Sequence, residues 1–164
     1  DGLILEFGVA SGYSIRQLSS LTKQDIHGFD SFQGLPEAWA HLSEGAFSSK
    51  GVMPEVPDNV SLHVGLFEES LPIFLKENKG PIRLLNIDCD LYSSTKTILN
   101  WLRPILPSGT IFYFDDIWPF HGNPDYGELK AINDFNDEDS GYLTPYPVLG
   151  MISYVYIYSK KNYE

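Results

Sequence analysis

Residues 84–95 read LLNIDCDLYSST, and a shorter form of the same pattern, IFYFDD, follows at residues 111–116. In each segment, a short apolar run of the kind that forms a strand buried on both faces ends in acidic residues. Parallel strands that lie side by side deliver their carboxyl ends to the same edge of a sheet, and open α/β sheets bind ligands there. We therefore expect these acidic residues to gather at one site.

The acidic residues are Asp88 and Asp90 in the first segment and Asp115 and Asp116 in the second. About one strand-helix-strand crossover separates the two segments, which suits neighbouring parallel strands. Carboxylates in such proximity repel one another unless they share a proton or a cation, and oxygen ligands suit a hard ion such as Mg²⁺. The alternative is that each Asp serves only its own turn or helix start.

A second pattern lies at the start of the chain, where an apolar strand at residues 3–9 leads into a turn that contains Gly8 and Gly12. Bare backbone N–H groups at a helix start favour an anionic group, which points to a nucleotide-type ligand. The next strand, residues 25–30, ends in Asp30 about 20 residues after the glycines, where a carboxylate reaches the ribose hydroxyls in Rossmann-like sheets. The glycine spacing differs from that of dinucleotide enzymes, and a tight turn without a ligand is the alternative.

The rest of the chain alternates between strand and helix patterns, which predicts a mostly parallel α/β sheet with helices on both faces. Residues 31–59 lack periodicity and are expected to form a lid or binding loop, or else a loop whose aromatic residues pack underneath. Two strands at residues 143–148 and 152–158, separated by Gly150, predict an antiparallel hairpin. Further strands are expected at residues 59–65, 82–87 and 110–114, and helices near residues 15–21, 71–78, 93–102 and 127–136.

Composition limits the function further. With 164 residues, 43% of them hydrophobic, the chain suits one domain over residues 1–164. Its formal net charge of −11 argues against nucleic-acid and anionic-membrane partners, because phosphate binding needs clustered Lys and Arg. No apolar run is long enough to cross a membrane. The single cysteine, Cys89, excludes internal disulfides, is compatible with a cytoplasmic protein, and is expected to pack in the core rather than act as a nucleophile.

Five motifs occur in order along the chain: LEFGVASG at residues 5–12, GFDSFQGLPE at 28–37, GLF at 65–67, IDCDLYSST at 87–95 and FDD at 114–116. Together they resemble the macrocin O-methyltransferase family, whose members use S-adenosylmethionine to methylate sugars of macrolide and aminocoumarin antibiotics. The resemblance runs through nearly the whole chain. It implies a Rossmann-like class I methyltransferase fold with a mostly parallel seven-stranded sheet. It also implies Mg²⁺-dependent methyl transfer to a hydroxyl of a small molecule such as a sugar or glycosylated natural product.

The resemblance also implies roles for individual residues. Asp88, Asp115 and Asp116 match the family's magnesium ligands, and Asp90 matches its general base. The residues that would bind S-adenosylmethionine are Glu6, Gly8, Ser11, Gly12 and Ser14 around its methionine part, Asp30 on the ribose, and Ser31, Gly65 and Phe67 near the adenosine.

Family members usually have a longer N-terminal portion, which helps to cover the cofactor and to form dimers. The chain is therefore expected to lack an N-terminal lid segment. A homodimer stays one of the possible oligomeric states. Two other interpretations also stay open. One is a methyltransferase fold kept as a binding module without catalysis. The other is a haloacid-dehalogenase-like phosphatase, which also carries Asp-x-Asp after a strand but needs more sequence before its second acidic pair.

Overall fold

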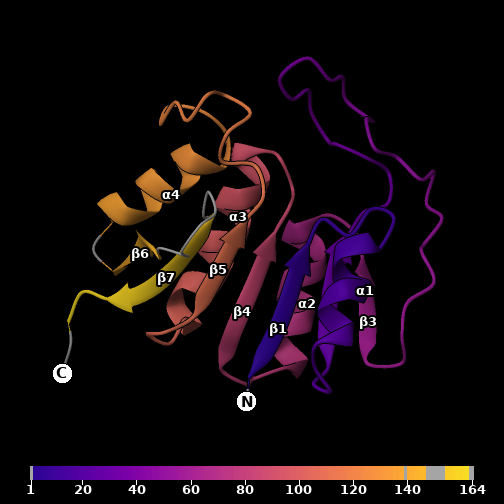
Figure 1. Ribbon diagram of the computed structural model, residues 1–164, viewed down its shortest axis with the longest axis horizontal. Coiled ribbons are helices and arrows are strands. Elements are labelled where there is room, and N and C mark those ends of the chain that lie inside the picture. The colour runs from indigo at the N-terminus through magenta and orange to yellow at the C-terminus, as the bar shows by residue number, and fades with distance from the viewer. Residues whose placement is uncertain (1, 139, 147–153, 163–164) are drawn as a thin grey trace.

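The computed structural model describes residues 2–138, 140–146 and 154–162. Its centre is a seven-stranded sheet with the order β3-β2-β1-β4-β5-β7-β6 (Figure 1). The strands β1 to β5 pair in parallel, whereas β7 pairs antiparallel with both β5 and β6. This confirms the predicted fold class. The strands are β1 (Leu3–Phe7), β2 (Ile26–Asp30), β3 (Val60–Val64), β4 (Ile82–Ile87), β5 (Ile111–Phe114), β6 (Gly141–Pro145) and β7 (Val155–Lys160).

Helices cover both faces of the sheet, as predicted. Helix α1 (Tyr13–Ser20) packs beside β2 on one face, in front of the sheet in Figure 1. On the other face α2 (Phe67–Glu77) packs against α3 (Tyr92–Leu102), which in turn packs against α4 (Gly127–Asp137). A short 3₁₀ helix at Arg103–Ile105 follows α3. Within the described residues, none of the helices has the length and apolar character that a membrane crossing requires.

Each face of the sheet has its own hydrophobic cluster. Leu5 and Phe7 of β1 belong to the larger cluster beneath α2, α3 and α4, whereas Ile4 belongs to the smaller one beneath α1. Successive side chains of a strand point to opposite faces, so a strand buried on both sides must be apolar throughout. The central position of β1 thus explains why its sequence is an unbroken apolar run apart from Glu6.

The backbones of β1 and β4 come very close where the two strands end. Gly8 has φ +89°, and a Cβ atom built there would lie 1.6 Å from the carbonyl oxygen of Asp88. Only glycine tolerates both this backbone conformation and this approach. Gly8 therefore holds the first loop directly against the acidic segment after β4.

The observed elements differ from the prediction mainly at their ends. Helix α2 begins at Phe67 rather than at residue 71, with Glu68 and Glu69 in its first turn, where acidic side chains suit the helix dipole. The C-terminal antiparallel pair is confirmed, but β6 and β7 are shifted relative to residues 143–148 and 152–158. The expected turn around Gly150, with the rest of residues 147–153, lies outside the described part of the chain.

Candidate active site

The loops that follow β1, β2, β4 and β5 line a cavity of about 550 Å³. The cavity lies where the strand order reverses, because β2 and β4 flank β1 on opposite sides. This is the usual ligand position in open α/β sheets. The predicted site residues in its lining are Gly8, Asp30, Ser31, Gly65, Phe67, Asp88, Asp90, Asp115 and Asp116.

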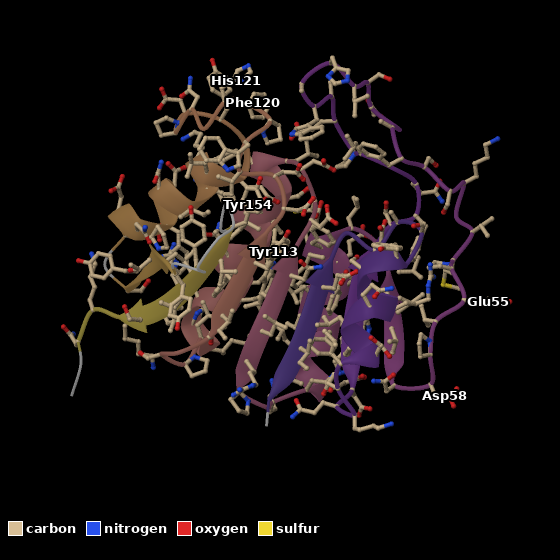
Figure 2. All side chains as sticks on the ribbon, viewed as in Figure 1. Glu55, Asp58, Tyr113, Phe120, His121 and Tyr154 are labelled. Atoms are coloured by element: carbon tan, nitrogen blue, oxygen red, sulfur yellow. The ribbon has the colours of Figure 1, made fainter. Side chains whose placement is uncertain are left out.

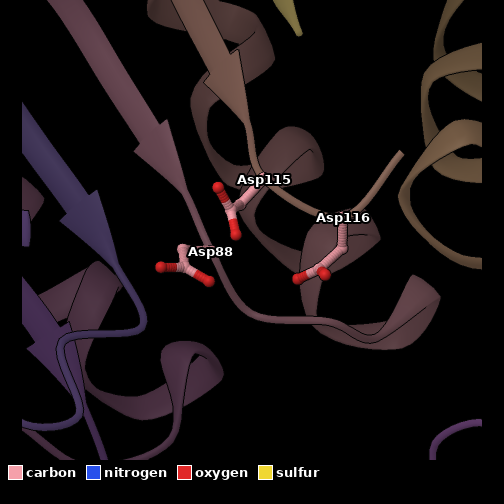
Figure 3. A group of neighbouring side chains, drawn as sticks. All are labelled: Asp88, Asp115 and Asp116. Carbon is pink, nitrogen blue, oxygen red and sulfur yellow. The ribbon is translucent and has the colours of Figure 1, made fainter. Parts of the chain in front are cut away.

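Three carboxylates meet at the end of β4 and β5. One oxygen each from Asp88, Asp115 and Asp116 lies within 4.8 Å of the others (Figure 3). Asp88 follows β4, and Asp115 and Asp116 follow β5, so the parallel pairing of these two strands brings the carboxylates together. The predicted clustering of the acidic residues is confirmed, and the donor set of carboxylate oxygens suits Mg²⁺.

The electrostatics of this cluster favour a proton or a cation. Burial, followed by the charges of Asp115 and Asp116, raises the pKa of Asp88 to about 7. Burial, followed by the charge of Asp90, raises the pKa of Asp116 to about 7. A divalent cation among the carboxylates would stabilise their ionised forms and reverse these shifts.

Asp90 lies beside the cluster and also faces the cavity. Its backbone has φ 64°, a left-handed conformation that Asp adopts more readily than most residues. Its carboxyl group shares a hydrogen bond with that of Asp116, and burial raises the pKa of Asp90 to about 6. A carboxyl group of this kind can take up a proton near neutral pH, which is the property a general base needs.

Asp30 organises the loop that follows β1. Its Oδ2 accepts hydrogen bonds from the backbone N–H groups of Val9 and Ala10, both at 2.8 Å. Its Oδ1 accepts one from Phe32 at 2.7 Å. A carboxylate has about four acceptor positions, so these bonds leave room for about one further donor. Asp30 therefore fixes the loop and still lines the cavity, where the sequence had placed a ribose-binding group.

The other residues of the glycine motif lie outside the cavity lining. Glu6 is fully buried and accepts hydrogen bonds from Ser14 Oγ at 2.8 Å and Asn86 Nδ2 at 2.9 Å. A Cβ atom at Gly12 would meet the Arg16 guanidinium and the ring of Pro54 rather than the cavity. Ser11, which was also predicted to bind the methionine part, is likewise absent from the described lining. In this structure these residues shape the turn from β1 into α1.

The irregular segment between β2 and β3 closes one side of the cavity. Its lining residues include Leu35, Glu37, Trp39 and Phe47. Ser93 Oγ on α3 donates a hydrogen bond to Glu37. The Trp39 ring packs edge-on against the Phe120 ring, with 6.4 Å between the ring centroids. Phe120 lies on the loop after β5, above the sheet in Figure 2. The segment is thus attached to elements on the far side of the cavity, as a lid would be.

The large apolar residues of this segment differ in where they lie. Phe32 is buried in the cluster beneath α1, as the alternative interpretation of the segment allowed. Met53 is exposed and absent from the described lining. Of these residues, only Trp39 and Phe47 line the cavity, as a lid requires.

Several residues that line the cavity were not among the predicted site residues. Ser93, Ser94 and Thr97 face the cavity from α3. Ser93 and Thr97 are four residues apart, a spacing that puts two side chains on one face of a helix, and this could have identified them. Cys89 also borders the cavity but is buried and shares a hydrogen bond with Thr95, and burial raises the pKa of its thiol, as expected of a packing residue.

Comparison with known proteins places this geometry in a family. A methyltransferase domain family matches residues 5–117. No curated protein sequence matches the chain significantly. Among solved structures, CalS11, a calicheamicin methyltransferase, is 25% identical, with 98% of this chain and 72% of CalS11 covered and a TM-score of 0.75.

Two further structures share the fold at lower identity. The O-methyltransferase NovP is 21% identical, with 99% of this chain and 73% of NovP covered and a TM-score of 0.63. The methyltransferase MycE is 15% identical, with 98% of this chain and 44% of MycE covered and a TM-score of 0.58. The family match includes both acidic segments and the glycine loop that line the cavity. Since that match spans well over half of the sequence, the chain belongs to this methyltransferase domain family.

Proposed function

We propose that the protein is a Mg²⁺-dependent O-methyltransferase that transfers a methyl group from S-adenosylmethionine to a hydroxyl of a sugar or a glycosylated natural product. The observation that carries this proposal is the meeting of Asp88, Asp115 and Asp116 beside Asp90 in one cavity. The family membership supports S-adenosylmethionine as the methyl donor. The acidic cluster offers a metal site and a base, which a hydroxyl acceptor needs.

Asp88, Asp115 and Asp116 would hold Mg²⁺. When bound there, the ion supplies a Lewis acid that binds acceptor oxygens and lowers the pKa of the reacting hydroxyl. Asp90 would accept the proton of that hydroxyl as the oxygen forms its bond to the methyl carbon and the carbon–sulfur bond of the donor breaks. S-adenosylmethionine supplies an activated methyl group, so the chain mainly has to align the reacting atoms.

The described lining suits this donor. Each charged lining residue is acidic, which favours a ligand that bears a positive sulfonium. Asp30, Ser31, Gly65 and Phe67 border the part of the cavity next to β2 and β3, where the nucleoside of the donor would lie. Glu6, Ser11, Gly12 and Ser14 would then act on the methionine part through the shape of the turn rather than as cavity walls.

The solved structures support the choice of acceptor class. CalS11 is described as a TDP-rhamnose 3′-O-methyltransferase of calicheamicin biosynthesis. MycE, which shares the fold, acts in mycinamycin biosynthesis and was solved with Mg and S-adenosylhomocysteine. A cytoplasmic location, a homodimer and a single domain over residues 1–164 stay predictions. The phosphatase interpretation receives no support from the family match.

Calorimetry tests the proposal directly. The protein is titrated with S-adenosylmethionine and S-adenosylhomocysteine, with and without Mg²⁺, and with NADH and a nucleotide sugar as controls. Methyl transfer to a panel of glycosides is then measured with and without a chelator. The double variant Asp115→Asn, Asp116→Asn should bind S-adenosylmethionine normally and lose the effect of Mg²⁺.

The expected result is micromolar binding of the two sulfur compounds and metal-dependent methylation. Binding without turnover on any glycoside would instead support the binding-module alternative. If neither sulfur compound binds, the proposed function is wrong for this chain.

A further inference from the structure

Glu128 is a fully buried carboxyl group that the proposed mechanism does not use. It lies in the first turn of α4 and has no exposed surface. Burial of a carboxyl group is costly unless the group has polar partners, so its position requires a physical reason. Its neighbours supply one, because they belong to the two loops that carry the acidic residues of the cavity.

The first neighbour is the loop after β5. Glu128 Oε2 accepts a hydrogen bond from the backbone N–H of Asp116 at 3.0 Å. This bond fixes the backbone of one proposed metal ligand, while its carboxylate faces the cavity.

The second neighbour is the loop after β4. Burial, followed by the charge of Asp116, raises the pKa of Glu128 well above its usual value, and the nearby backbone N–H of Cys89 opposes part of that rise. The second carboxyl oxygen, Oε1, has no hydrogen-bond partner among the described residues. Cys89 is the residue between Asp88 and Asp90, so its N–H belongs to the segment that holds another proposed ligand and the proposed base. Glu128 thus binds the backbone of one acidic loop by a hydrogen bond, and the start of its helix lies beside the backbone of the other.

The start of α4 is itself fixed in place. A Cβ atom built on Gly127 would lie 3.1 Å from the Phe120 ring and 4.0 Å from the carbonyl oxygen of Asp90. The positive end of the helix dipole also favours an acceptor in this first turn. Glu128 therefore projects from a helix whose first turn packs against Phe120 and the loop after β4, and a site built on a helix holds ligands at better-defined distances than one built on a loop.

We propose that Glu128 is a positioning residue that ties the loop after β5 to the start of α4, which packs against the loop after β4, and so sets the spacing of Asp116 relative to Asp88 and Asp90. This rests on the proposed function, since it takes these residues to be metal ligands and base. The role requires an acceptor oxygen at the reach of a Glu side chain, whereas a net charge at this position is not required.

Two variants of Glu128 distinguish the effect of side-chain length from the effect of side-chain charge. Glu128→Gln keeps an acceptor oxygen at the same reach without a carboxylate. Glu128→Asp keeps the carboxylate but withdraws it by one methylene. Loss of a residue that supports metal ligands typically costs 10–100-fold in metal affinity or activity. We expect Glu128→Asp to weaken Mg²⁺ binding about 10–100-fold and to lower kcat, with S-adenosylmethionine affinity within about threefold of wild type.

Glu128→Gln should retain Mg²⁺ affinity and kcat within a few-fold of wild type. Asp137→Asn, at the exposed end of the same helix, is the matched control and should change neither quantity. Circular dichroism checks that each variant is folded, and calorimetry measures both ligands on the same samples.

The outcomes separate this inference from the proposed function. Wild-type Mg²⁺ affinity in Glu128→Asp, or a Gln variant that is impaired as much as the Asp variant, overturns the positioning role alone. Parallel losses of S-adenosylmethionine and Mg²⁺ binding in Glu128→Asp also overturn it, because they indicate a general structural defect. If the wild-type protein binds S-adenosylmethionine but not Mg²⁺, the proposed metal site fails and this role fails with it.

Discussion

Replacing Asp88 by Asn should stabilise the metal-free protein at pH 8 and abolish its response to Mg²⁺. Burial and the neighbouring carboxylates raise the pKa of Asp88 from 3.8 to about 7. Each pKa unit corresponds to about 1.4 kcal/mol, so ionised Asp88 destabilises the fold by at most about 4 kcal/mol. Because Asp88 is partly exposed, screening by water reduces the expected gain in the variant to about 1–2 kcal/mol.

The gain should depend on pH in a defined direction. Between pH 3.8 and about 7 the folded protein keeps a proton on Asp88 that the unfolded chain has released. The stability that protonated Asp88 allows is therefore fully present below this window and is lost as the pH rises through it. Asn carries no charge at any pH. The variant should consequently exceed the wild-type stability at pH 8 and match it near pH 4.

Thermal and urea unfolding in the presence of a chelator measure both effects. For a chain of this length, about 1–2 kcal/mol corresponds to a rise in Tm of roughly 2–8 °C. Added Mg²⁺ should stabilise the wild type at pH 8 and leave Asp88→Asn unchanged. Asp58→Asn, at an exposed position far from the cavity (Figure 2), is the control and should stay within about 0.5 kcal/mol of wild type. A variant less stable than wild type at pH 8, or stabilised equally at both pH values, would refute the reasoning.

Three further substitutions test other parts of the site, and a fourth serves as a control. Asp30→Ala removes the acceptor of three backbone N–H groups and should weaken S-adenosylmethionine binding at least about tenfold by calorimetry, whereas unchanged affinity would contradict its role. Asp90→Asn should slow methyl transfer by about 10²–10⁴-fold in single-turnover assays while donor affinity is preserved, and full activity would remove Asp90 from the mechanism. Gly8→Ala should lower the free energy of unfolding by more than about 3 kcal/mol, because its Cβ overlaps the Asp88 carbonyl. Gly109→Ala, with φ +93° and open space around it, should cost only about 1–2 kcal/mol, and equal losses at the two glycines would show that the close approach is unimportant.

The parts of the fold that could be predicted were encoded locally. Apolar runs that end in acidic residues predict strands β4 and β5. Their parallel pairing follows from the single crossover of ordinary length that connects them. The insertion of β7 between β5 and β6 has no such local signal, since it depends on pairs such as Phe112 with Tyr156. The early start of α2 was missed because Pro72 lies inside the helix, where proline normally disfavours helix.

The same distinction applies to the site. The acidic cluster could be predicted because strand order alone brings its members together. Glu6 lies in the glycine motif, but its side chain points into the protein, where it accepts hydrogen bonds from Ser14 and Asn86. The motif alone does not indicate this orientation. Glu128 could not be predicted, because nothing in the sequence near α4 indicates which face of that helix meets the acidic loops.

The central place of β1 also governs how the chain folds. Leu5 of β1 pairs with His27 of β2 on one side and with Leu85 of β4 on the other. During synthesis the first pairing can form early, but the opposite edge of β1 stays bare until the second half of the chain emerges. Pairing between distant strands slows refolding. An unpaired strand edge can associate with other chains, so the fraction of protein lost to aggregation during refolding should increase with protein concentration. The carboxylates of the cavity meet only once β4 and β5 have joined the sheet, so the acidic cluster cannot form before this pairing between distant parts of the sequence.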